Sequence, residues 1–324
     1  MFEKMVAMLK EKPRKLVFTE GTDPRILQAA GRLLREGLMV PVLLGPKEEV
    51  EALAKENGIS LAGMEVIDPA NYDAFDAMVK EMAELRRGKM TEDECRDALK
   101  KGNYFGTMLV KQGYAHGLLG GATYSTADTV RPALQIVKTR PGCKIVSSCF
   151  IMNKEGESGD ERYAMADCAI NLDPNEDELV EITVETARMA KLFSIEPKVA
   201  MLSFSTYGSG KGPGVDKMRT AAEKMKAMPL DFPVDGELQF DAAFVPEVGK
   251  LKAPQSKVAG EANVFIFPDI NASNIGYKIA QRLGGFEALG PILLGLNAPI
   301  NDLSRGCNVD EVYKMAIITA ASAE

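Results

Sequence analysis

The first third of the chain alternates short apolar runs with stretches in which apolar residues recur at helical spacing. Residues 15–19 and 39–44 are apolar runs typical of buried strands, and a third short strand is predicted near residues 64–67. Amphipathic helices are predicted between these strands, over residues 25–36 and 47–57. Strands separated by helices indicate a parallel α/β sheet.

A further helix is predicted at the N-terminus, where Met, Val and Leu alternate with Lys and Glu over residues 1–15. This stretch lacks the continuous apolar core and the small-residue cleavage site of a signal peptide. No apolar stretch of the sequence is long enough to span a bilayer. We therefore expect a protein that does not associate with a membrane.

The pattern changes near Cys143, after which the apolar runs are separated by polar or glycine-rich loops. A chain of 324 residues exceeds the usual size of one hydrophobic core, so two domains are expected. The loop at residues 208–214 fits neither the glycine pattern of dinucleotide-binding folds nor that of a P-loop, and we interpret it as a mobile surface loop. Strands are predicted in this half at residues 144–152, 199–205, 240–245 and 263–267.

Charge and composition argue against several classes of protein and of active site. The net charge is −7, from 39 basic and 46 acidic residues, which argues against a nucleic-acid-binding protein. The only histidine is His116, so a histidine metal cluster is excluded and a serine–histidine or cysteine–histidine pair would have to use it. The five cysteines include no CxxC pair, which favours free thiols in a reducing cytoplasm.

Two segments point to a ligand site. Gly117–Gly121 is predicted to be a strand end that opens into a helix, the place where open α/β sheets bind ligands. Near the C-terminus, Ser304, Arg305 and Cys307 precede an apolar helix. A helix N-terminus attracts anions, and a guanidinium suits phosphate or carboxylate groups. This run therefore predicts an oxyanion site, in which the Cys307 thiolate would be stabilised.

The same run, Asn301–Cys307, resembles the C-terminal signature of the phosphate acetyltransferases, and Ser125–Ala133 is similar to the central motif of that family. These and other similar segments follow one another in the family's order along nearly the whole chain. The other segments are Gln239–Ala243, Lys250–Pro254, Phe265–Ala272 and Asn274–Phe286.

The resemblance implies a specific architecture. Phosphate acetyltransferases have two α/β domains around a cleft, arranged as in isocitrate and isopropylmalate dehydrogenases. The second domain is inserted into the first, so we expect a first domain of residues 1–143 plus 293–324 and a second of residues 144–292. The family is usually homodimeric.

The resemblance also implies an activity, the reversible transfer of acetyl between acetyl phosphate and coenzyme A by direct thiolate attack. Coenzyme A is then a substrate, and neither a metal nor a tightly bound cofactor is expected. An acetyl-cysteine intermediate on Cys307 is the less favoured route, because no histidine is at hand to relay the proton. The alternatives are a phosphate butyryltransferase-like enzyme and, from another class, an NAD-dependent dehydrogenase of related architecture.

Carried over by motif, the C-terminal signature supplies the catalytic residues. Arg305 is expected to bind the phosphoryl group, and its alternative is an ion pair with Asp302. Ser304 is expected to hydrogen-bond the reacting carbonyl or phosphate, and its alternative is helix capping. Glu311, seven residues after Ser304, is the expected base, with Asp310 as substitute. Glu311 also has capping-box spacing from Asn308, which leaves its role open.

The central motif supplies substrate-binding residues. Arg131 is expected to bind phosphate or the carbonyl, and the hydroxyls of Ser125, Thr126 and Thr129 to reach phosphate oxygens. Capping of the helix near Thr126 is the alternative for all three hydroxyls.

Two further positions are less fixed by the motifs. Arg86 or its neighbour Arg87 matches a family arginine that contacts coenzyme A, with a solvated helix end as the alternative. His116 stands where the family usually has aspartate, and we interpret it as structural.

Overall fold

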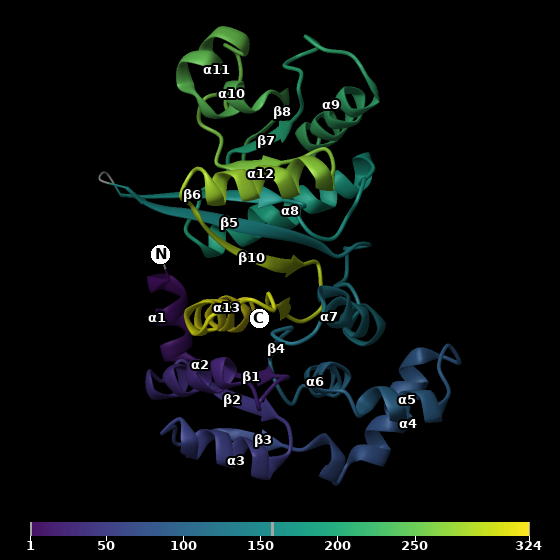
Figure 1. The fold of residues 1–324 in the computed structure, drawn as a ribbon. Coiled ribbons are helices and arrows are strands. Elements are labelled where there is room, and N and C mark those ends of the chain that lie inside the picture. The colour runs from purple at the N-terminus through teal and green to yellow at the C-terminus, as the bar shows by residue number, and fades with distance from the viewer. Residues whose placement is uncertain (1, 157–158, 324) are drawn as a thin grey trace. The chain divides into compact units, whose positions relative to one another are not determined.

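The computed structural model describes residues 2–156 and 159–323. The chain divides into two compact units. One unit combines Phe2–Gly142 with the chain from Leu296 onward, and the other is the continuous segment Cys143–Gly295 (Figure 1). Each unit contains its own sheet and its own helices.

The discontinuous unit is built on a five-stranded parallel sheet. Its strands follow the order β11-β4-β1-β2-β3. In the centre of the sheet, Val17 of β1 lies opposite Val42 of β2 and Leu118 of β4. The parallel sheet and its first three strands agree with the sequence prediction. The bounds are β1 (Arg14–Phe18), β2 (Met39–Leu44), β3 (Glu65–Ile67), β4 (Gly117–Gly120) and β11 (Ile300–Asp302).

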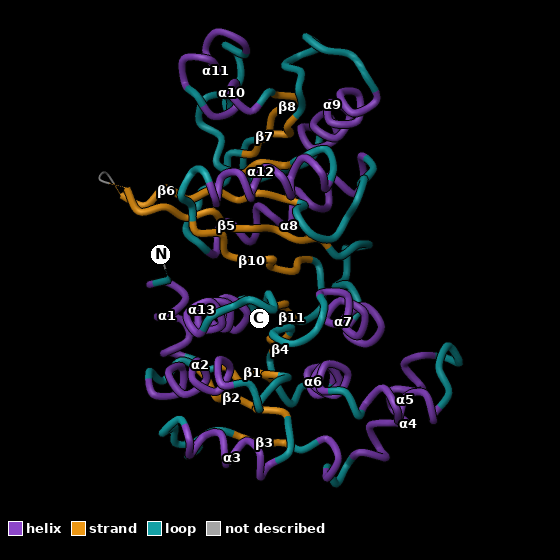
Figure 2. Tube along the Cα trace, viewed as in Figure 1, coloured by secondary structure: helices purple, strands orange, loops and turns teal. Residues whose placement is uncertain are grey.

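Helices cover both faces of this sheet. Helix α13 packs on one side of β1 and β4, beside α2, which packs on β2, and α6 packs on the other side of β1 and β4 (Figure 2). Buried apolar side chains of β1 alternate between the two faces, so each layer of helices has its own core. The helices are α1 (Glu3–Glu11), α2 (Pro24–Arg35), α3 (Lys47–Glu56), α4 (Phe75–Arg86), α5 (Glu92–Leu99), α6 (Gly102–Lys111), α7 (Thr126–Pro132) and α13 (Val309–Ala321), with the short helices η1 (Pro69–Asn71) and η2 (Ala133–Val137).

The continuous unit is built on a mixed six-stranded sheet in the order β10-β5-β6-β9-β7-β8. The pairs β10–β5 and β5–β6 are antiparallel, and the remaining pairs are parallel. The bounds are β5 (Ser147–Gly156), β6 (Gly159–Ala166), β7 (Val199–Leu202), β8 (Val234–Leu238), β9 (Val264–Ile266) and β10 (Glu287–Leu294), with helices α8 (Glu176–Leu192), α9 (Pro213–Lys226), α10 (Phe240–Phe244), α11 (Pro246–Lys252) and α12 (Ile270–Arg282).

The strand predicted at residues 240–245 is wrong. Phe240–Phe244 is the short helix α10, in which Phe240 and Phe244 stack at the i,i+4 spacing with ring centroids 5.5 Å apart. The neighbouring strand is β8, whose acidic residues Asp235 and Glu237 are both buried. Buried carboxylates interrupt the apolar pattern from which a strand is predicted. Here they bond Tyr207, Lys226 and Arg219 instead of facing water.

Within the described part of the chain, no helix is both long and apolar enough to cross a membrane. The sulfurs of all five cysteines are unbridged, as the sequence predicts.

Candidate active site

The candidate site lies where three neighbouring parallel strands of the discontinuous unit end. Strand β1 is followed by Thr19 and Glu20, β4 by residues 121–124, and β11 by residues 303–307. Because these strands are adjacent in the order β11-β4-β1, their carboxyl ends meet at one edge of the sheet. Open α/β sheets bind ligands at this edge.

Two glycines let the three strand ends approach one another. A Cβ on Gly120 would lie 2.1 Å from Thr19 Oγ1 and 2.2 Å from the Tyr124 hydroxyl oxygen. Gly121 has a φ of +103°, and a Cβ there would lie 2.2 Å from Asp302 Oδ1. Only glycine fits a positive φ and so close a contact without strain. The glycines predicted at this strand end therefore shape the site.

Asp302 is a buried carboxyl at the end of β11. Its Oδ2 accepts a hydrogen bond from Thr126 Oγ1 and its Oδ1 one from Thr129 Oγ1, each at 2.5 Å. Burial raises the pKa of Asp302, although the two hydrogen bonds partly offset the effect. The hydroxyls of Thr126 and Thr129 are thus held by this carboxyl rather than used to cap α7. To bind phosphate they would have to exchange these bonds.

The remaining residues of the central motif lie on α7. Ser125 is the N-cap residue, but its Oγ donates to Asp128 at 2.7 Å instead of accepting from a backbone N–H. Arg131 is exposed in the last turn of α7 and has Asp128 as its ion-pair partner, with Nη1 and Oδ1 3.7 Å apart. Its guanidinium therefore remains accessible to an anion.

Arg25, in the first turn of α2, ties the strand ends together. Its Nη1 donates to the carbonyl oxygens of Arg305 and Cys307, both at 2.9 Å. Its Nη2 donates to the carbonyl of Ala122 at 3.0 Å and to Asp23 Oδ2 at 2.7 Å. The sequence analysis missed Arg25. The signal that could have revealed it is an arginine in the first helical turn after a strand end rich in polar residues.

Ser304 and Arg305 are exposed on the loop between β11 and α13. Ser304 Oγ accepts a hydrogen bond from the N–H of Gly306 at 3.3 Å, while α13 has Asn308 as its N-cap, so Ser304 does not cap that helix. The alternative ion pair between Arg305 and Asp302 is absent, since Asp302 is engaged by two threonines. In the part of the chain that the structure describes, the guanidinium of Arg305 has no hydrogen bond or ion pair.

Cys307 does not have the stabilised thiolate expected from its place before a helix. The side chain is only 4% exposed, and burial raises its pKa to about 11. The nearby Arg25, with Nη1 3.7 Å from the sulfur, lowers the pKa by less than burial raises it. The expectation is wrong because it considered the helix end and left out desolvation.

The two acidic residues expected to act as base have other partners. Glu311 forms a capping box with Asn308: Glu311 Oε2 accepts from the N–H of Asn308 at 3.0 Å, and Asn308 Oδ1 accepts from the N–H of Glu311 at 2.9 Å. Asp310 binds Lys314 Nζ at 2.9 Å and Arg32 Nη1 at 3.3 Å. The hydrogen bond from Lys314 lowers the pKa of Asp310, with a further contribution from Arg32.

Two adjoining cavities open at the same edge of the sheet. One has a volume of about 640 Å³ and is lined by residues that include Arg131, Lys101 and Tyr124. The other, of about 450 Å³, reaches Asp23 and Pro46. Both volumes fall within the range of small-molecule sites, roughly 300–1,000 Å³. The residues common to both linings are Thr19, Glu20, Gly102 and Thr123.

Comparison with known proteins identifies the family. The family model described as "Phosphate acetyl/butaryl transferase" matches residues 1–320. The chain belongs to this family. The phosphate acetyltransferase of Bacillus subtilis (strain 168) is 53% identical over 309 residues, which cover 95% of this chain and 94% of the relative. That of Staphylococcus epidermidis (strain ATCC 12228) is 50% identical over 320 residues, which cover 97% and 96%.

A solved structure agrees with these relatives. The crystal structure of a phosphotransacetylase from Streptococcus pyogenes superimposes with a TM-score of 0.94 at 54% identity, covering 99% of this chain and 98% of that one. The predictions of a two-domain α/β fold and of a phosphate acetyltransferase are therefore confirmed.

Arg86 and Arg87, expected to contact coenzyme A, and His116, interpreted as structural, lie outside the cluster of strand ends. Arg86 is half-buried at the end of α4, donates from Nη1 to the carbonyl of Gln135 at 3.2 Å, and has a buried Nε without a partner in the described structure. Arg87 is exposed as the C-cap of α4, in the left-handed region with a φ of 48°. His116 precedes β4, at the opposite edge of the sheet from the site, and its Nδ1 accepts from the N–H of Lys15 at 3.0 Å.

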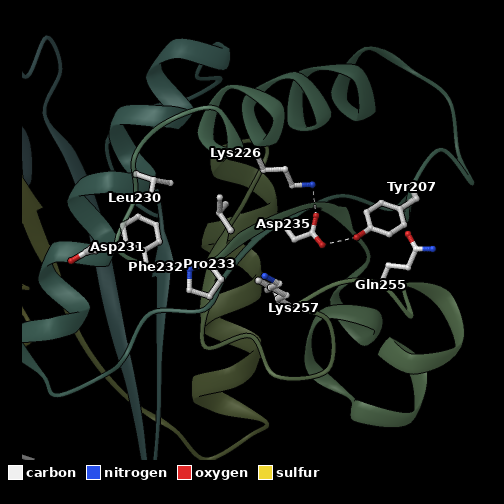
Figure 3. A pocket seen from close by; sticks show the side chains of 11 residues that line it. Tyr207, Lys226, Leu230, Asp231, Phe232, Pro233, Asp235, Gln255 and Lys257 are labelled. Carbon is white, nitrogen blue, oxygen red and sulfur yellow. Dashed lines mark hydrogen bonds and ion pairs between the residues drawn. The ribbon is translucent and has the colours of Figure 1, made fainter.

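The continuous unit has a cavity of its own, of about 700 Å³ (Figure 3). Its central carboxyl, Asp235, accepts a hydrogen bond from the Tyr207 hydroxyl and pairs with Lys226 Nζ, each at 2.5 Å. These polar groups satisfy one another, and no residue named by the motifs lines the cavity. No group of three or more metal-ligating side chains that could hold an ion is found in either described segment of the chain.

Proposed function

We propose that this member of the family transfers acetyl reversibly between acetyl phosphate and coenzyme A, so that acetyl-CoA and phosphate interconvert with coenzyme A and acetyl phosphate. The observation that carries the proposal is the nearly full-length match to phosphate acetyltransferases at about half identity. The site geometry supports it, because two cavities open at the carboxyl ends of the strands and the exposed guanidinium of Arg131 lines one of them.

Arg305 is proposed to bind the phosphoryl group. Its main chain is fixed through the carbonyl held by Arg25, while its guanidinium remains available for a bidentate contact. Ser304, its neighbour, is proposed to donate its hydroxyl to the carbonyl oxygen of the acetyl group, where negative charge develops during attack. The exposure of both side chains supports these roles.

The substrate-binding roles follow the same reasoning. Arg131 lines the larger of the two cavities at the strand ends and is proposed to bind phosphate or the carbonyl. The hydroxyls of Ser125, Thr126 and Thr129 are proposed as further donors, which requires them to exchange their hydrogen bonds to Asp128 and Asp302. Arg86 or Arg87 is proposed to contact an anionic group of coenzyme A. Arg87 is the more accessible of the two, since Arg86 is half-buried.

Direct attack by coenzyme A is proposed in preference to an acetyl-cysteine intermediate. A thiol with a pKa near 11 is almost wholly protonated at neutral pH, which makes Cys307 a poor nucleophile. In the direct reaction, the family motif gives Glu311 the role of the base that removes the proton from the thiol, with Asp310 as substitute. Of these two, Glu311 is the better candidate, because two cations stabilise the Asp310 carboxylate.

The test is a thioester-formation assay with purified protein, coenzyme A and acetyl, propionyl or butyryl phosphate. We expect the highest kcat/KM with acetyl phosphate, and initial-rate lines that intersect when both substrates are varied. A preference for butyryl phosphate would favour the butyryltransferase alternative. Parallel lines together with a trapped acetyl-enzyme would favour the covalent route. Reduction of NAD with a hydroxy acid, without thioester formation, would indicate the dehydrogenase.

The setting of the enzyme is also a proposal. We propose a cytoplasmic homodimer without a tightly bound cofactor, whose partners are its small-molecule substrates rather than nucleic acid or membrane. The unbridged cysteines support a reducing compartment. We further propose domains of residues 1–143 plus 293–324 and 144–292, which the division of the chain near Gly142 and Leu296 supports.

A further inference from the structure

The guanidinium of Arg25 lies at the site with every one of its N–H donors in use. Nε and Nη2 donate to Oδ1 and Oδ2 of Asp23, at 3.0 and 2.7 Å. Nη2 also donates to the carbonyl oxygen of Ala122 at 3.0 Å, and Nη1 donates to those of Arg305 and Cys307, both at 2.9 Å. A guanidinium has five N–H donors, so none is left for a substrate. Arg25 is therefore suited to holding the protein rather than the ligand.

Asp23 holds the Arg25 side chain in one orientation. It is the N-cap residue of α2, and its Oδ1 accepts a further hydrogen bond from the main-chain N–H of Arg25 at 2.9 Å. Its side chain is 11% exposed, and both of its oxygens face the planar edge of the guanidinium. The start of α2 thus carries a rigid fork that points at the neighbouring loops.

One of these loops, after β4, is fixed by a second residue as well. The peptide group between Ala122 and Thr123 is bonded at both polar atoms. Its carbonyl accepts from Arg25, and its N–H donates to Oε1 of the buried Glu20 at 2.8 Å. The hydroxyl of Thr123 donates to the same oxygen at 3.0 Å. The loop after β4 is therefore a fixed reference to which Arg25 can hold another segment.

The loop of residues 304–307, after β11, depends on Arg25 for its position. Within the loop, the N–H of Cys307 donates to the carbonyl of Ser304 at 2.9 Å, and that of Gly306 donates to Ser304 Oγ at 3.3 Å. Of the hydrogen bonds that reach this loop from elsewhere in residues 2–156 and 159–323, all come from Arg25. Without them, Ser304 and Arg305 would be held only through their chain neighbours.

We propose that Arg25 is a positioning residue for acetyl transfer, which sets the place of the Arg305 guanidinium by holding the main chain on either side of Gly306. This inference rests on the proposed acetyl transfer and on the proposed role of Arg305. Arg25 does not touch the substrate. It keeps the group that binds the phosphoryl group at a constant distance from the loop after β4, and a misplacement of about 1 Å at such a site can cost roughly 10²-fold in rate.

A lysine at this position separates the geometry from the charge. Its ammonium has three donors on a single nitrogen, so it cannot bond both oxygens of Asp23 and all three carbonyls. The positive charge, however, remains at the site. Arg25→Lys should therefore release the loop of residues 304–307 while it leaves the net charge of the site unchanged.

The test is a double-mutant cycle of Arg25→Lys and Arg305→Ala, measured in the thioester-forming direction. We expect Arg25→Lys alone to lower kcat/KM for acetyl phosphate by about 10²-fold and to leave the KM for coenzyme A unchanged. In the Arg305→Ala background the same change should cost about tenfold less, because the side chain that Arg25 positions is gone. Arg35→Lys, at an exposed position of the same helix, controls for the substitution itself and should leave turnover unchanged.

Asp23→Asn is a milder variant that keeps the prediction testable even if Arg25→Lys does not fold. Asparagine still caps α2, but its amide has one acceptor oxygen, so one bond to the guanidinium is lost. We expect a smaller loss of kcat/KM for acetyl phosphate, again with an unchanged KM for coenzyme A and again reduced in the Arg305→Ala background.

Three results would overturn the assignment. The first is turnover by Arg25→Lys within a few fold of wild type. The second is an equal fold loss with and without the Arg305 side chain, which a general structural role would produce. The third is a KM for coenzyme A that rises as much as that for acetyl phosphate. All three require an active wild type, whereas an inactive wild type would contradict the proposed acetyl transfer itself.

Discussion

At the scale of single residues, the site is organised by which polar groups are already satisfied and which are not. Asp302, Thr126 and Thr129 satisfy one another, and Arg25 uses both terminal nitrogens on main-chain carbonyls and Asp23. Arg305, by contrast, presents an exposed guanidinium. Arg25 and Asp302 thus hold the framework, whereas the guanidinium proposed to hold the phosphoryl group is not engaged in it.

This division gives a prediction for Arg305. Arg305→Ala should lower kcat/KM for acetyl phosphate by at least 10²-fold, because a charged donor to the phosphoryl group is lost. Arg305→Lys should recover part of the loss, since it keeps the charge but not the bidentate geometry. Steady-state kinetics with both substrates varied measure the effect.

Arg35→Ala is the matched control, as Arg35 is exposed at the end of α2. Thermal unfolding should be unchanged in both variants, because neither guanidinium is buried. Full turnover by Arg305→Ala would remove Arg305 from the site.

At this scale the sequence could name a residue where a motif covers it, and it could not foresee where burial decides the chemistry. Ser304 and Arg305 were predicted from the motif, and the structure places both side chains on an exposed loop, while their roles stay predictions. Arg25 and Glu20 could not be predicted, because polar residues after a strand also occur in ordinary turns until the neighbouring strands are known. Cys307 was misjudged because its pKa depends on desolvation, which the sequence does not reveal.

At the scale of elements, α13 connects stability to the site. The capping box of Asn308 and Glu311 begins this helix directly after the loop that carries Arg305. The buried Asn301 of β11 donates from Nδ2 to Thr319 Oγ1 at 2.9 Å, which fixes the helix against the strand. The loop from residue 303 to 307 is therefore held at both ends.

Removing the cap of α13 should lower both the stability of the protein and the rate of acetyl transfer. Asn308→Ala is expected to lower the free energy of unfolding by about 1 kcal/mol, since a side-chain acceptor for helix N–H groups is lost. It should also lower the rate of acetyl transfer, because the loop would be less well fixed. Denaturant unfolding and kinetic assays measure the two effects.

Helix α8 offers a control for this prediction. It begins with the same kind of capping box, formed by Asn175 and Glu178 in the other unit. Asn175→Ala should cause a comparable loss of stability and no change in turnover. Equal turnover in Asn308→Ala and Asn175→Ala would show that the α13 cap has no role in activity.

Elements with a clear period were predicted well from sequence, and those with buried charge were not. Strands β1 to β4 and helices α2, α3 and α13 follow simple apolar patterns, whereas β11, with the sequence Ile-Asn-Asp, does not and was not predicted. Strand β8 does not, because two of its buried residues are acidic. The antiparallel pairing of β5 with β6 was also missed, since β6 begins with a polar, exposed stretch and its buried apolar run, Ala164–Ala166, is only three residues long.

At the scale of the whole molecule, buried carboxyls make stability depend on pH. The pKa of Asp302 is raised in the folded state, so this group binds protons more strongly there than in the unfolded chain. Its contribution to stability is therefore fully present below its unfolded pKa and is lost as the pH rises through the folded pKa.

Asp302→Asn should expose this dependence. The difference in unfolding free energy between the variant and wild type should shift in favour of the variant as the pH rises from about 4, and level off once the pH exceeds the folded pKa of Asp302. Each unit of raised pKa corresponds to about 1.4 kcal/mol. A difference that stays constant between pH 4 and 7 would contradict a raised pKa for Asp302.

The order of strands was beyond the reach of apolar patterns, because periodicity does not specify which strands are neighbours. The expectation of an inserted second domain came from the resemblance alone. In the structure β4 and β11 are adjacent although 179 positions separate Gly117 from Leu296, where the chain returns to its first unit.

The pairing of β11 with β4 has a consequence for biosynthesis. Ile300–Asp302 emerges from the ribosome only after the whole of the other unit has been made. Until then, β4 lacks the strand that pairs with this edge, β11. A nascent chain interrupted before that point would carry most of its helices and strands and yet lack the loop proposed to bind phosphate. Catalytic competence would thus arise only after the whole of the other unit and the loop that follows β11 have been made.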